Sequence, residues 1–413
     1  MRIAIIGSGI SGLTAAYLLH NDHQITIYEK NNYIGGHSNT VDARLQEKIF
    51  PVDTGFIVFN EKTYPNFVKL LRKLGVIWKK SDMSFSVSCQ RTGLEYSPSS
   101  LGNIFAQRKN ILNPSLWKMA LDIFRFRKNY ENVLNESEDI TLMDLLEREK
   151  YSRFFRDYFI IPMGAAIWSA DPKHFGQIPA KFFIRFFQNH GFLNIKNQPQ
   201  WLTIEKGSRQ YVEVLTAGFK NQIRLSSAVT NIRRFNDYVL IKTADKKEEK
   251  YDHVIIATHS DQAIVMLDDP SEAENNILSA IPYNKNITVL HTDVSLLPKI
   301  HKTWASWNYF IPEKEKANVI LTYNMNMLQS IQASDTFCVT LNAKEQIHQK
   351  KILYEIEYAH PMFQKESVDA QKRHHEISGN NRTHYCGAYW GNGFHEDGVN
   401  SALEVCKYFD KGL

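Results

Sequence analysis

Short apolar runs alternate with a helix-like stretch along the first thirty residues. The run RIAII (Arg2–Ile6) ends at a glycine and predicts a buried strand. SGLTAAYLLH (Ser11–His20) predicts a helix, and QITIYE (Gln24–Glu29) predicts a second strand. The order strand, glycine turn, helix, strand is that of the first βαβ unit of a parallel sheet.

The pattern changes twice along the rest of the chain. From about residue 100 to 190 it is mostly helical and aromatic, which predicts an insertion that interrupts the sheet. At Gly207 the α/β pattern returns, and YDHVIIATHSDQA (Tyr251–Ala263) predicts a buried strand that passes into a helix. Residues 284–342 alternate as strands of a mostly antiparallel sheet. From Thr383 onward we expect a strand, a glycine-rich loop and a helix.

Composition and charge narrow the class of protein only a little. The chain has 413 residues, 43% apolar and 23% charged, as in ordinary globular proteins. The net charge is +5 and no nucleic-acid-binding module is recognisable, so we expect no nucleic-acid partner. The four cysteines are far apart, without a CxxC pair: Cys89, Cys338, Cys386 and Cys406. We therefore expect no bound metal, a reducing compartment and a cytoplasmic location.

The first glycine motif has the form GxGxxG and lies between the predicted strand and helix. Gly7 would allow the tight turn, Gly9 the approach of a pyrophosphate, and Gly12 close packing of helix and strand. Glu29 ends the second strand, where an acid binds the hydroxyls of an adenosine ribose. The pattern predicts an adenine-dinucleotide site; the alternative is a glycine turn in an unrelated parallel sheet. Further candidate contacts at the motif and the acid are Ser8, Ser11 and Lys30.

A second glycine pair favours FAD over NAD. Gly35 and Gly36 follow closely after Glu29, and a Gly-Gly step places backbone N–H groups near an anion. The alternative is an ordinary turn. Near the C-terminus, Gly387 stands at a strand end and Gly398 is expected to start a helix whose N-terminus can stabilise a reduced flavin ring.

These motifs together resemble the flavin-containing amine oxidase superfamily, which includes protoporphyrinogen oxidases, phytoene desaturases and monoamine oxidases. Five segments resemble one subgroup of FAD-dependent oxidoreductases, which is similar to the N-terminal half of plant cyclopropane-fatty-acid synthases: GGHSNTV, VDTGFIVFNEKTYPNF, PMGAAIWSA, WASWNY and GFHEDG. The resemblance implies an α/β fold with a Rossmann-like, glutathione-reductase-like FAD-binding domain interleaved with an α+β substrate domain. The FAD-binding domain would comprise residues 1–75, 201–265 and 380–413, and the substrate domain residues 76–200 and 266–379.

The resemblance also implies roles for individual residues. Gly35, Gly36 and His37 would form a second phosphate-facing turn, with His37 where many relatives have an arginine. Val229 matches the position that pairs with adenine. The residues near the ribityl chain and the flavin ring would be Thr54, Gly55, Gly387, Gly398 and Val399. The lysine that amine-oxidising relatives carry near the flavin is absent at Thr288, with Lys285 off-register, and no cysteine matches a covalent flavin link, so we expect non-covalent FAD.

Aromatic residues and histidines are the candidates for a substrate pocket. The pocket candidates are Trp168, His291, Trp304, Trp390 and His395. Hydride transfer needs an apolar, water-poor pocket, which such side chains can line; the alternative is that most belong to the core and that the histidines are structural. FRFRK (Phe124–Lys128) and KFFIRFF (Lys181–Phe187) mix basic and aromatic residues as membrane-surface segments do, or as ordinary helices with a buried aromatic face do.

The leading hypothesis is an FAD-dependent oxidoreductase. It would take a hydride from a C–H bond of a hydrophobic substrate such as a fatty-acyl chain or lipid; a lipid substrate would favour peripheral contact with the inner face of the membrane. The first alternative is a flavin-containing amine oxidase. The second is a non-catalytic FAD-binding partner of a lipid methyltransferase. The lipid and methyltransferase hypotheses rest on the resemblance alone.

Overall fold

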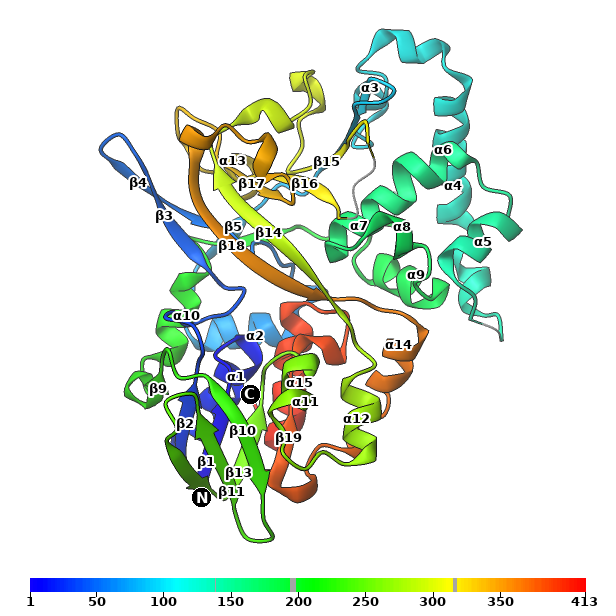
Figure 1. Ribbon diagram of the computed structural model, residues 1–413. Helices are drawn as coiled ribbons and strands as arrows, with labels where there is room; N and C mark the ends of the chain where they lie inside the picture. Colours follow the sequence, from blue (N-terminus) through cyan, green and yellow to red (C-terminus); the bar gives the residue numbers. More distant parts are fainter. Residues whose placement is uncertain (138, 194–197, 315–317) are drawn as a thin grey trace.

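The computed structural model describes residues 1–137, 139–193, 198–314 and 318–413. Figure 1 shows a parallel sheet in the lower part, a larger sheet above it, and a group of helices at the upper right. The chain therefore has the mixed α/β character that the apolar pattern predicted.

The lower sheet has five parallel strands in the order β19–β13–β1–β2–β9. The strands are β1 (Arg2–Ile6), β2 (Gln24–Tyr28), β9 (Ile223–Arg224), β13 (His253–Ile256) and β19 (Thr383–Tyr385). Helix α1 (Ile10–Leu19) joins β1 to β2, which confirms the predicted βαβ unit. Strands β1 and β13 are almost wholly apolar because both of their faces are covered.

Two different layers cover this sheet. On one face, Ile3, Ile5 and Ile255 pack in a core with α1, α2 (Pro65–Lys73), α10 (Arg209–Thr216) and α15 (His395–Lys407). On the other face, Ala4 and Ile256 pack against a three-stranded antiparallel sheet. That sheet consists of β10 (Val229–Arg234), β11 (Val239–Thr243) and β12 (Glu248–Tyr251). The parallel sheet is thus the middle layer of three.

The upper sheet has seven strands in the order β18–β14–β17–β16–β15–β6–β7. The strands are β6 (Phe85–Cys89), β7 (Leu94–Tyr96), β14 (Tyr283–His291), β15 (Trp307–Ile311), β16 (Ile320–Asn324), β17 (Cys338–Leu341) and β18 (Ile352–Pro361). All neighbours are antiparallel except β15 and β6. The prediction of a mostly antiparallel sheet over residues 284–342 is confirmed. The hairpin β3 (Thr40–Leu45) and β4 (Lys48–Asp53) projects beside it (Figure 1).

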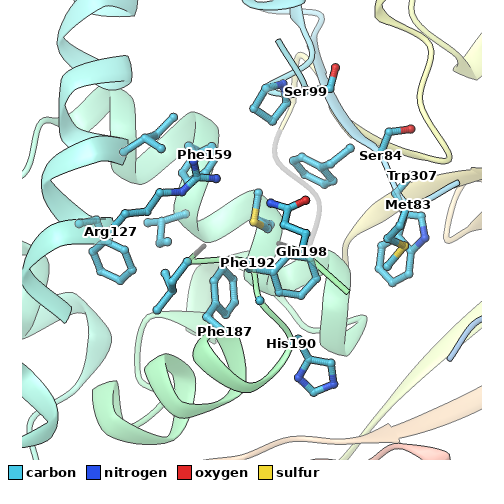
Figure 2. Close-up of a pocket in the computed structure, with 18 of the residues that line it drawn as sticks. Met83, Ser84, Ser99, Arg127, Phe159, Phe187, His190, Phe192, Gln198 and Trp307 are labelled. Atoms are coloured by element: carbon cyan, nitrogen blue, oxygen red, sulfur yellow. The ribbon is translucent and has the colours of Figure 1, made fainter. Parts of the chain in front are cut away.

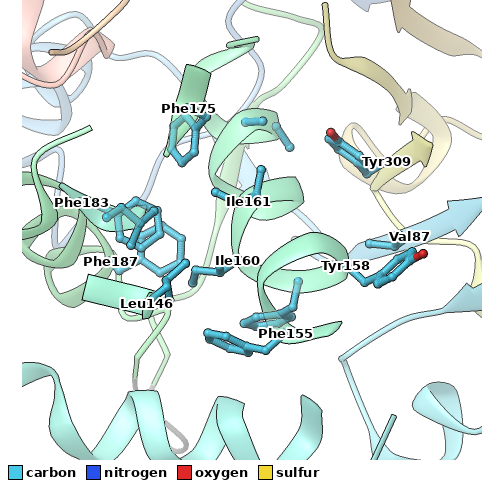
Figure 3. Close-up of a cluster of buried hydrophobic side chains, with 14 of the residues drawn as sticks. Val87, Leu146, Phe155, Tyr158, Ile160, Ile161, Phe175, Phe183, Phe187 and Tyr309 are labelled. Atoms are coloured by element: carbon cyan, nitrogen blue, oxygen red, sulfur yellow. The ribbon is translucent and has the colours of Figure 1, made fainter. Parts of the chain in front are cut away.

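The insertion predicted between residues 100 and 190 is helical, as expected. Its helices are α3 (Leu101–Ile104), α4 (Pro114–Leu134), α5 (Leu142–Arg148), α6 (Arg153–Phe155), α7 (Ile161–Trp168), α8 (Pro172–Phe175) and α9 (Ala180–Asn189). Figure 3 shows their shared core, where Phe155, Phe183 and Phe187 are buried. The aromatic side chains of KFFIRFF therefore belong mainly to this core, which is the ordinary-helix alternative for that segment.

Helix α15 begins three residues earlier than the predicted start at Gly398. The reason is a local cap: the backbone N–H of Phe394 donates to Asp397 Oδ2 at 3.0 Å. Because this bond fixes the first turn, His395 becomes helical and Gly398 lies inside that turn. No helix within the described residues is long and apolar enough to cross a bilayer.

Candidate functional site

The first glycine turn connects β1 to α1 at the carboxyl end of the parallel sheet. Gly7 has φ +103°, and a Cβ on it would lie 2.9 Å from the carbonyl oxygen of Ala257. A Cβ on Gly12 would lie 2.1 Å from the Gly7 oxygen. Around the Cβ position of Gly9, by contrast, no atom of the described residues comes within 4 Å. The N-terminus of α1 therefore faces open space that a side chain at position 9 would enter.

Glu29 is tied directly to this turn. Its Oε2 accepts hydrogen bonds from the backbone N–H of Ser8 at 3.0 Å and from Ser8 Oγ at 2.7 Å. Its Oε1 accepts from the N–H of Asn31 at 2.8 Å. Ser11 is buried beneath the turn, whereas Lys30 is exposed to solvent. The acid thus lies where the sequence expected it, at the edge of the glycine turn.

The second glycine turn packs against the first. The N–H of Gly35 donates to the carbonyl of Ser8 at 3.0 Å, and a Cβ on Gly36 would lie 3.3 Å from the Cα of Gly9. Both Gly35 and Gly36 have positive φ, at +117° and +60°. The first and second glycine turns, which are separate in sequence, therefore form one continuous backbone surface.

His37 presents a buried nitrogen beside these turns. Within the described part of the chain, its Nε2 has no hydrogen-bond partner, and neither does His259 Nδ1 or Trp390 Nε1. The His37 ring stacks on Tyr358 with centroids 4.7 Å apart, and its centroid is 5.2 Å from that of His360. Burial lowers the pKa of His37 to about 4, so the ring is neutral at pH 7. Buried polar atoms without partners are uncommon, and a polar ligand beside the glycine turns would satisfy His37 Nε2.

The loop after β4 runs alongside His37. A Cβ on Gly55 would lie 2.2 Å from the carbonyl oxygen of His37, and the N–H of Phe56 donates to that oxygen at 2.7 Å. Thr54 Oγ1 lies 2.9 Å from the hydroxyl of Tyr358. Thr54 and Gly55 therefore lie beside the second glycine turn.

Asp53, one residue before Thr54, is a buried hub, a role that its motif VDTGFIVFNEKTYPNF did not indicate. It accepts hydrogen bonds from Thr40 Oγ1 at 2.6 Å, from Ser208 Oγ at 2.8 Å and from Gln329 Nε2 at 3.0 Å. The backbone N–H of Ser208 also donates to it at 2.9 Å. Burial raises the pKa of Asp53 to about 6 although these donors act to lower it. The carboxyl group holds together segments that come from four parts of the chain.

The start of α15 reaches both glycine turns. A Cβ on Gly398 would lie 2.7 Å from Ile10 at the start of α1. His395 Nε2 lies 2.9 Å from Ser38 Oγ, and its ring stacks on Phe56 with centroids 3.5 Å apart. Two helix N-termini therefore meet at the same place.

The remaining cofactor candidates lie at the margins of this region. Gly387 follows β19, and its N–H donates to Ser401 Oγ of α15 at 2.9 Å, while Val399 is fully buried in the core. Val229 begins β10, two residues after Ser227, whose N–H donates to the Glu29 carbonyl at 2.8 Å. The chain segment that leads to Val229 therefore passes beside the acid.

An apolar cavity of about 460 Å³ lies in the helical insertion, against the edge of the upper sheet. Figure 2 shows it between α4, α7 and the segment after α9. Among its apolar lining residues are Phe126, Phe159, Met163, Phe187, Phe192 and Trp307. Its described lining contains no Asp or Glu, and its one permanently charged side chain is Arg127, which makes no hydrogen bond or ion pair within the described chain. The volume is in the range of pockets for small organic ligands.

The predicted pocket residues lie elsewhere, since none of the five is among those that line this cavity. Trp168 Nε1 donates to the carbonyl of Asn392 at 3.0 Å, and Trp304 Nε1 donates to that of Pro298 at 2.7 Å. His291 is fully buried in β14; its Nδ1 accepts from the N–H of Asp293, so its Nε2 donates to Thr340 Oγ1 at 2.7 Å. His395 lies near the glycine turns instead, as described above, whereas the Trp390 ring packs against His374 and Tyr389 with centroids 4.4 Å and 4.9 Å away.

A short chain of aromatic contacts joins the cavity to the glycine turns. His190, which lines the cavity, has its ring centroid 6.0 Å from that of Phe394. Phe394 directly precedes His395, which contacts Ser38 in the second turn. The residues that sequence reasoning missed are Tyr358, His259 and His360 at the turns and Arg127 in the cavity. Tyr358 and His360 belong to no motif, and nothing in the segments FRFRK and YDHVIIATHSDQA distinguishes Arg127 or His259, so only the fold reveals these positions.

A parallel sheet with glycine turns at its carboxyl edge is the arrangement in which many α/β enzymes bind a nucleotide cofactor. The chain belongs to one family in this class: the sequence model of the flavin containing amine oxidoreductases matches residues 10–292. The protein is therefore an FAD-dependent oxidoreductase of the amine oxidase and desaturase superfamily.

Similarity to curated proteins is confined to a short segment. 4,4'-Diapophytoene desaturases of Staphylococcus aureus are 43% identical over 56 residues, which is 13% of this chain and 10% of the relative. The chain thus matches only a small part of the length of these relatives.

Solved structures share the fold along the whole chain. A putative protoporphyrinogen oxidase from Exiguobacterium sp. 255-15 is 16% identical with a TM-score of 0.71, covering 99% of this chain and 98% of that one. The CLA-producing fatty acid isomerase from P. acnes is 16% identical with a TM-score of 0.68 and the same coverage. Putrescine oxidase bound to putrescine is 10% identical with a TM-score of 0.69, covering 99% of each chain.

Proposed function

We propose that this protein oxidises a C–H bond of an apolar substrate with an uncharged or anionic end, such as a fatty-acyl chain or lipid. The observation that carries the proposal is the cavity. It is apolar, lacks an acidic residue in its described lining and contains the guanidinium of Arg127, which makes no hydrogen bond or ion pair within the described chain. An apolar chain gains free energy by entering such a cavity, and a carboxylate or phosphate would pair with Arg127.

The proposal includes the position of FAD. The residues that would hold its pyrophosphate are those of the two glycine turns, with Glu29 at the adenosine ribose, Val229 near adenine, and Thr54, Gly55, Gly387, Gly398 and Val399 near the ribityl chain and ring. The open space at Gly9 and the partnerless His37 Nε2 support this fit. The part that binds FAD would be a Rossmann-like, glutathione-reductase-like domain of residues 1–75, 201–265 and 380–413. The substrate domain would be residues 76–200 and 266–379.

We also propose that FAD is held without a covalent bond to cysteine. The four cysteines are buried, and burial raises the pKa of Cys338 and Cys406 to about 12. Their thiols are therefore protonated and poor nucleophiles at neutral pH.

FAD supplies the hydride acceptor, and the surrounding residues supply binding, orientation and a dry environment. The helix N-termini of α1 and α15 provide partial positive charge. The neutral ring of His37 can donate or accept a hydrogen bond without adding a charge to the site. His190, at the cavity end nearest Phe394, has its pKa lowered to about 4 by burial, so the cavity gains no second cation there.

Amine oxidation is the alternative reaction, since amine oxidases share this fold. An ammonium substrate would meet the like charge of Arg127 and no described carboxylate in the cavity, which disfavours it. Lys285 does not restore the missing lysine, because its exposed side chain pairs with Glu357 at 3.1 Å.

Anaerobic reduction of the bound flavin tests the proposal. The purified holoprotein is mixed with long-chain fatty acids, phospholipids and a panel of primary amines, and the loss of the oxidised flavin absorbance is followed. Bleaching by an acyl compound supports the proposal, whereas bleaching by amines alone would replace it with amine oxidation. If no compound reduces the flavin and the protein binds a lipid methyltransferase tightly, the role of a non-catalytic FAD-binding partner takes its place.

A further inference from the structure

An exposed apolar surface covers the 3-10 turn η1 (Arg108–Leu112) and the first half of α4. We call it the α4 tip. Its members are large side chains that are between 46% and 88% exposed: Ile111, Leu112, Trp117, Leu121 and Phe124. Single exposed apolar residues are ordinary, but a group of five large apolar side chains on one turn and one helix is typical of an interaction surface.

The spacing on α4 gathers these side chains on one face. Trp117, Leu121 and Phe124 are separated by four and three residues, so they lie above one another along the helix. The opposite face, with Leu116, Met119 and other buried residues, packs into the core of the insertion. Helix α4 therefore has two apolar faces, and the protein covers only one of them.

The α4 tip is an ordered part of the fold. Trp117 Nε1 donates to the carbonyl oxygen of Ile111 at 2.8 Å, and the Trp117 ring packs on Phe105 with centroids 4.5 Å apart. Asn113 caps α4 by accepting from the N–H of Ser115 at 3.0 Å. These contacts tie the turn η1 to the start of α4, so the exposed side chains belong to one folded unit.

The charges around the α4 tip are almost entirely positive. Between residues 99 and 130 the sequence contains five basic residues besides the cavity residue Arg127: Arg108, Lys109, Lys118, Arg125 and Lys128. The one acid in that range, Asp122, is buried and lies 3.3 Å from Arg125. An apolar face flanked by Lys and Arg is the pattern of helices that lie in the interface of anionic bilayers.

The apolar cavity opens beside this surface. Phe124 is a member of the α4 tip and also lines the cavity, as do Ala120 and Ile123 on the same helix. A second copy of the chain would bring two positively charged tips together, which disfavours self-association through this face. We propose that the α4 tip docks on a bilayer containing anionic lipids, with its apolar side chains among the acyl chains. This proposal concerns binding and does not depend on the reaction.

Vesicle binding by the full-length holoprotein tests the proposal. The protein is sedimented with vesicles of phosphatidylcholine alone and with vesicles that also contain phosphatidylglycerol. We expect binding to the anionic vesicles, weakened by salt, and a loss of about tenfold or more in Leu112→Glu/Leu121→Glu, because each charge must stay out of the acyl region. Val265→Glu is the matched control, since Val265 is 81% exposed on α11 (Ser260–Met266), away from α4.

A fluorescent label locates the contact. The four native cysteines are buried, so Leu112→Cys offers a single accessible thiol for an environment-sensitive dye, and Val265→Cys offers the control. A blue shift of the dye at position 112 and none at position 265 supports docking through the α4 tip. Absence of binding to anionic vesicles, or equal loss in Val265→Glu, overturns the proposal, as does retained binding in Leu112→Glu/Leu121→Glu when its flavin content shows it to be folded.

Discussion

Gly9 and Gly36 are in backbone contact although 26 residues separate them: a Cβ on Gly36 would lie 3.3 Å from the Cα of Gly9. The contact brings the GxGxxG turn and the Gly-Gly turn into one surface. Because the Cβ position of Gly9 itself lies in open space, the glycine is not required there by packing within the described chain. The open space beside this glycine fits the approach of a ligand to the backbone of a GxGxxG turn.

Gly9→Ala should therefore fold and lose flavin. We expect the free energy of unfolding of the apoprotein to change by about 1 kcal/mol or less, as for an N-cap substitution. The added methyl group should lower FAD retention by about tenfold or more because it occupies the space left for the pyrophosphate. The measurements are flavin absorbance per protein after gel filtration and thermal unfolding of the apoprotein.

Two other glycines serve as controls for that substitution. Gly412→Ala places a methyl group in open space near the C-terminus and should leave both flavin content and stability unchanged. Gly12→Ala should destabilise the protein itself, since its Cβ would lie 2.1 Å from the Gly7 oxygen. If Gly9→Ala keeps its full flavin content, the assignment of the first turn to the pyrophosphate is wrong.

Asp53→Ala should be strongly destabilising. It would leave the hydroxyl of Thr40, the N–H of Ser208 and the amide of Gln329 without a buried acceptor. Each buried unsatisfied group costs about 1–3 kcal/mol, so we expect a loss of about 3 kcal/mol or more in urea unfolding. Asp42→Ala, on the same hairpin, removes only an exposed pair with Arg209 and should cost less than about 1 kcal/mol. Equal effects of the two substitutions would contradict the role of Asp53 as a hub.

The sequence predicted the local parts of this structure better than the long-range ones. The turn at Gly7, the acid at Glu29 and the helical insertion follow from spacing and periodicity over a few residues. The exact start of α15 depended on the Asp397 bond to Phe394, a cap between side chain and backbone that the glycine pattern did not indicate.

The residues that line the cavity could not be predicted for a different reason. An aromatic residue has the same signature whether it packs in a core or lines a cavity, and Trp168, Trp304 and His291 proved to be bonded elsewhere. Arg127 looked like one more basic residue of FRFRK. Its distinction is the lack of a partner within the described chain in an apolar cavity, which only the fold of the insertion, with α4 packed against α6 and α9, creates.

Acidification should destabilise the fold through its buried histidines. The pKa of His291 is lowered from 6.5 to about 4 because the ring is fully buried. Below pH 6.5 the unfolded chain binds a proton that the folded ring excludes until about pH 4, so stability falls as the pH drops through this window. The slope for one such group is about 1.4 kcal/mol per pH unit.

His291→Asn should reduce the pH dependence of the free energy of unfolding by up to about 1.4 kcal/mol per pH unit, the contribution of one proton. Urea unfolding at a series of pH values measures this dependence. Above pH 7 the two stability curves should run parallel, because neither protein then takes up a proton at this position. An unchanged slope between pH 4 and 6.5 in the variant would show that His291 is not among the residues responsible.

Arg127→Met should change the preference of the cavity for the end of its ligand. The guanidinium makes no hydrogen bond or ion pair within the described chain. Burial lowers the pKa of Arg127 from the usual 12.5, but an arginine side chain stays charged at neutral pH. Pairing with a carboxylate in an apolar cavity is worth about 1.5–3 kcal/mol, which predicts a loss of about tenfold or more in affinity for a long-chain fatty acid. The matching fatty alcohol should bind about equally to both proteins, since it offers no charge.

Arg185→Met, an exposed position on α9 outside the cavity, is the matched control. Titration calorimetry with both ligands measures the difference, and equal losses for acid and alcohol would show that Arg127 supports the cavity wall rather than an anionic end.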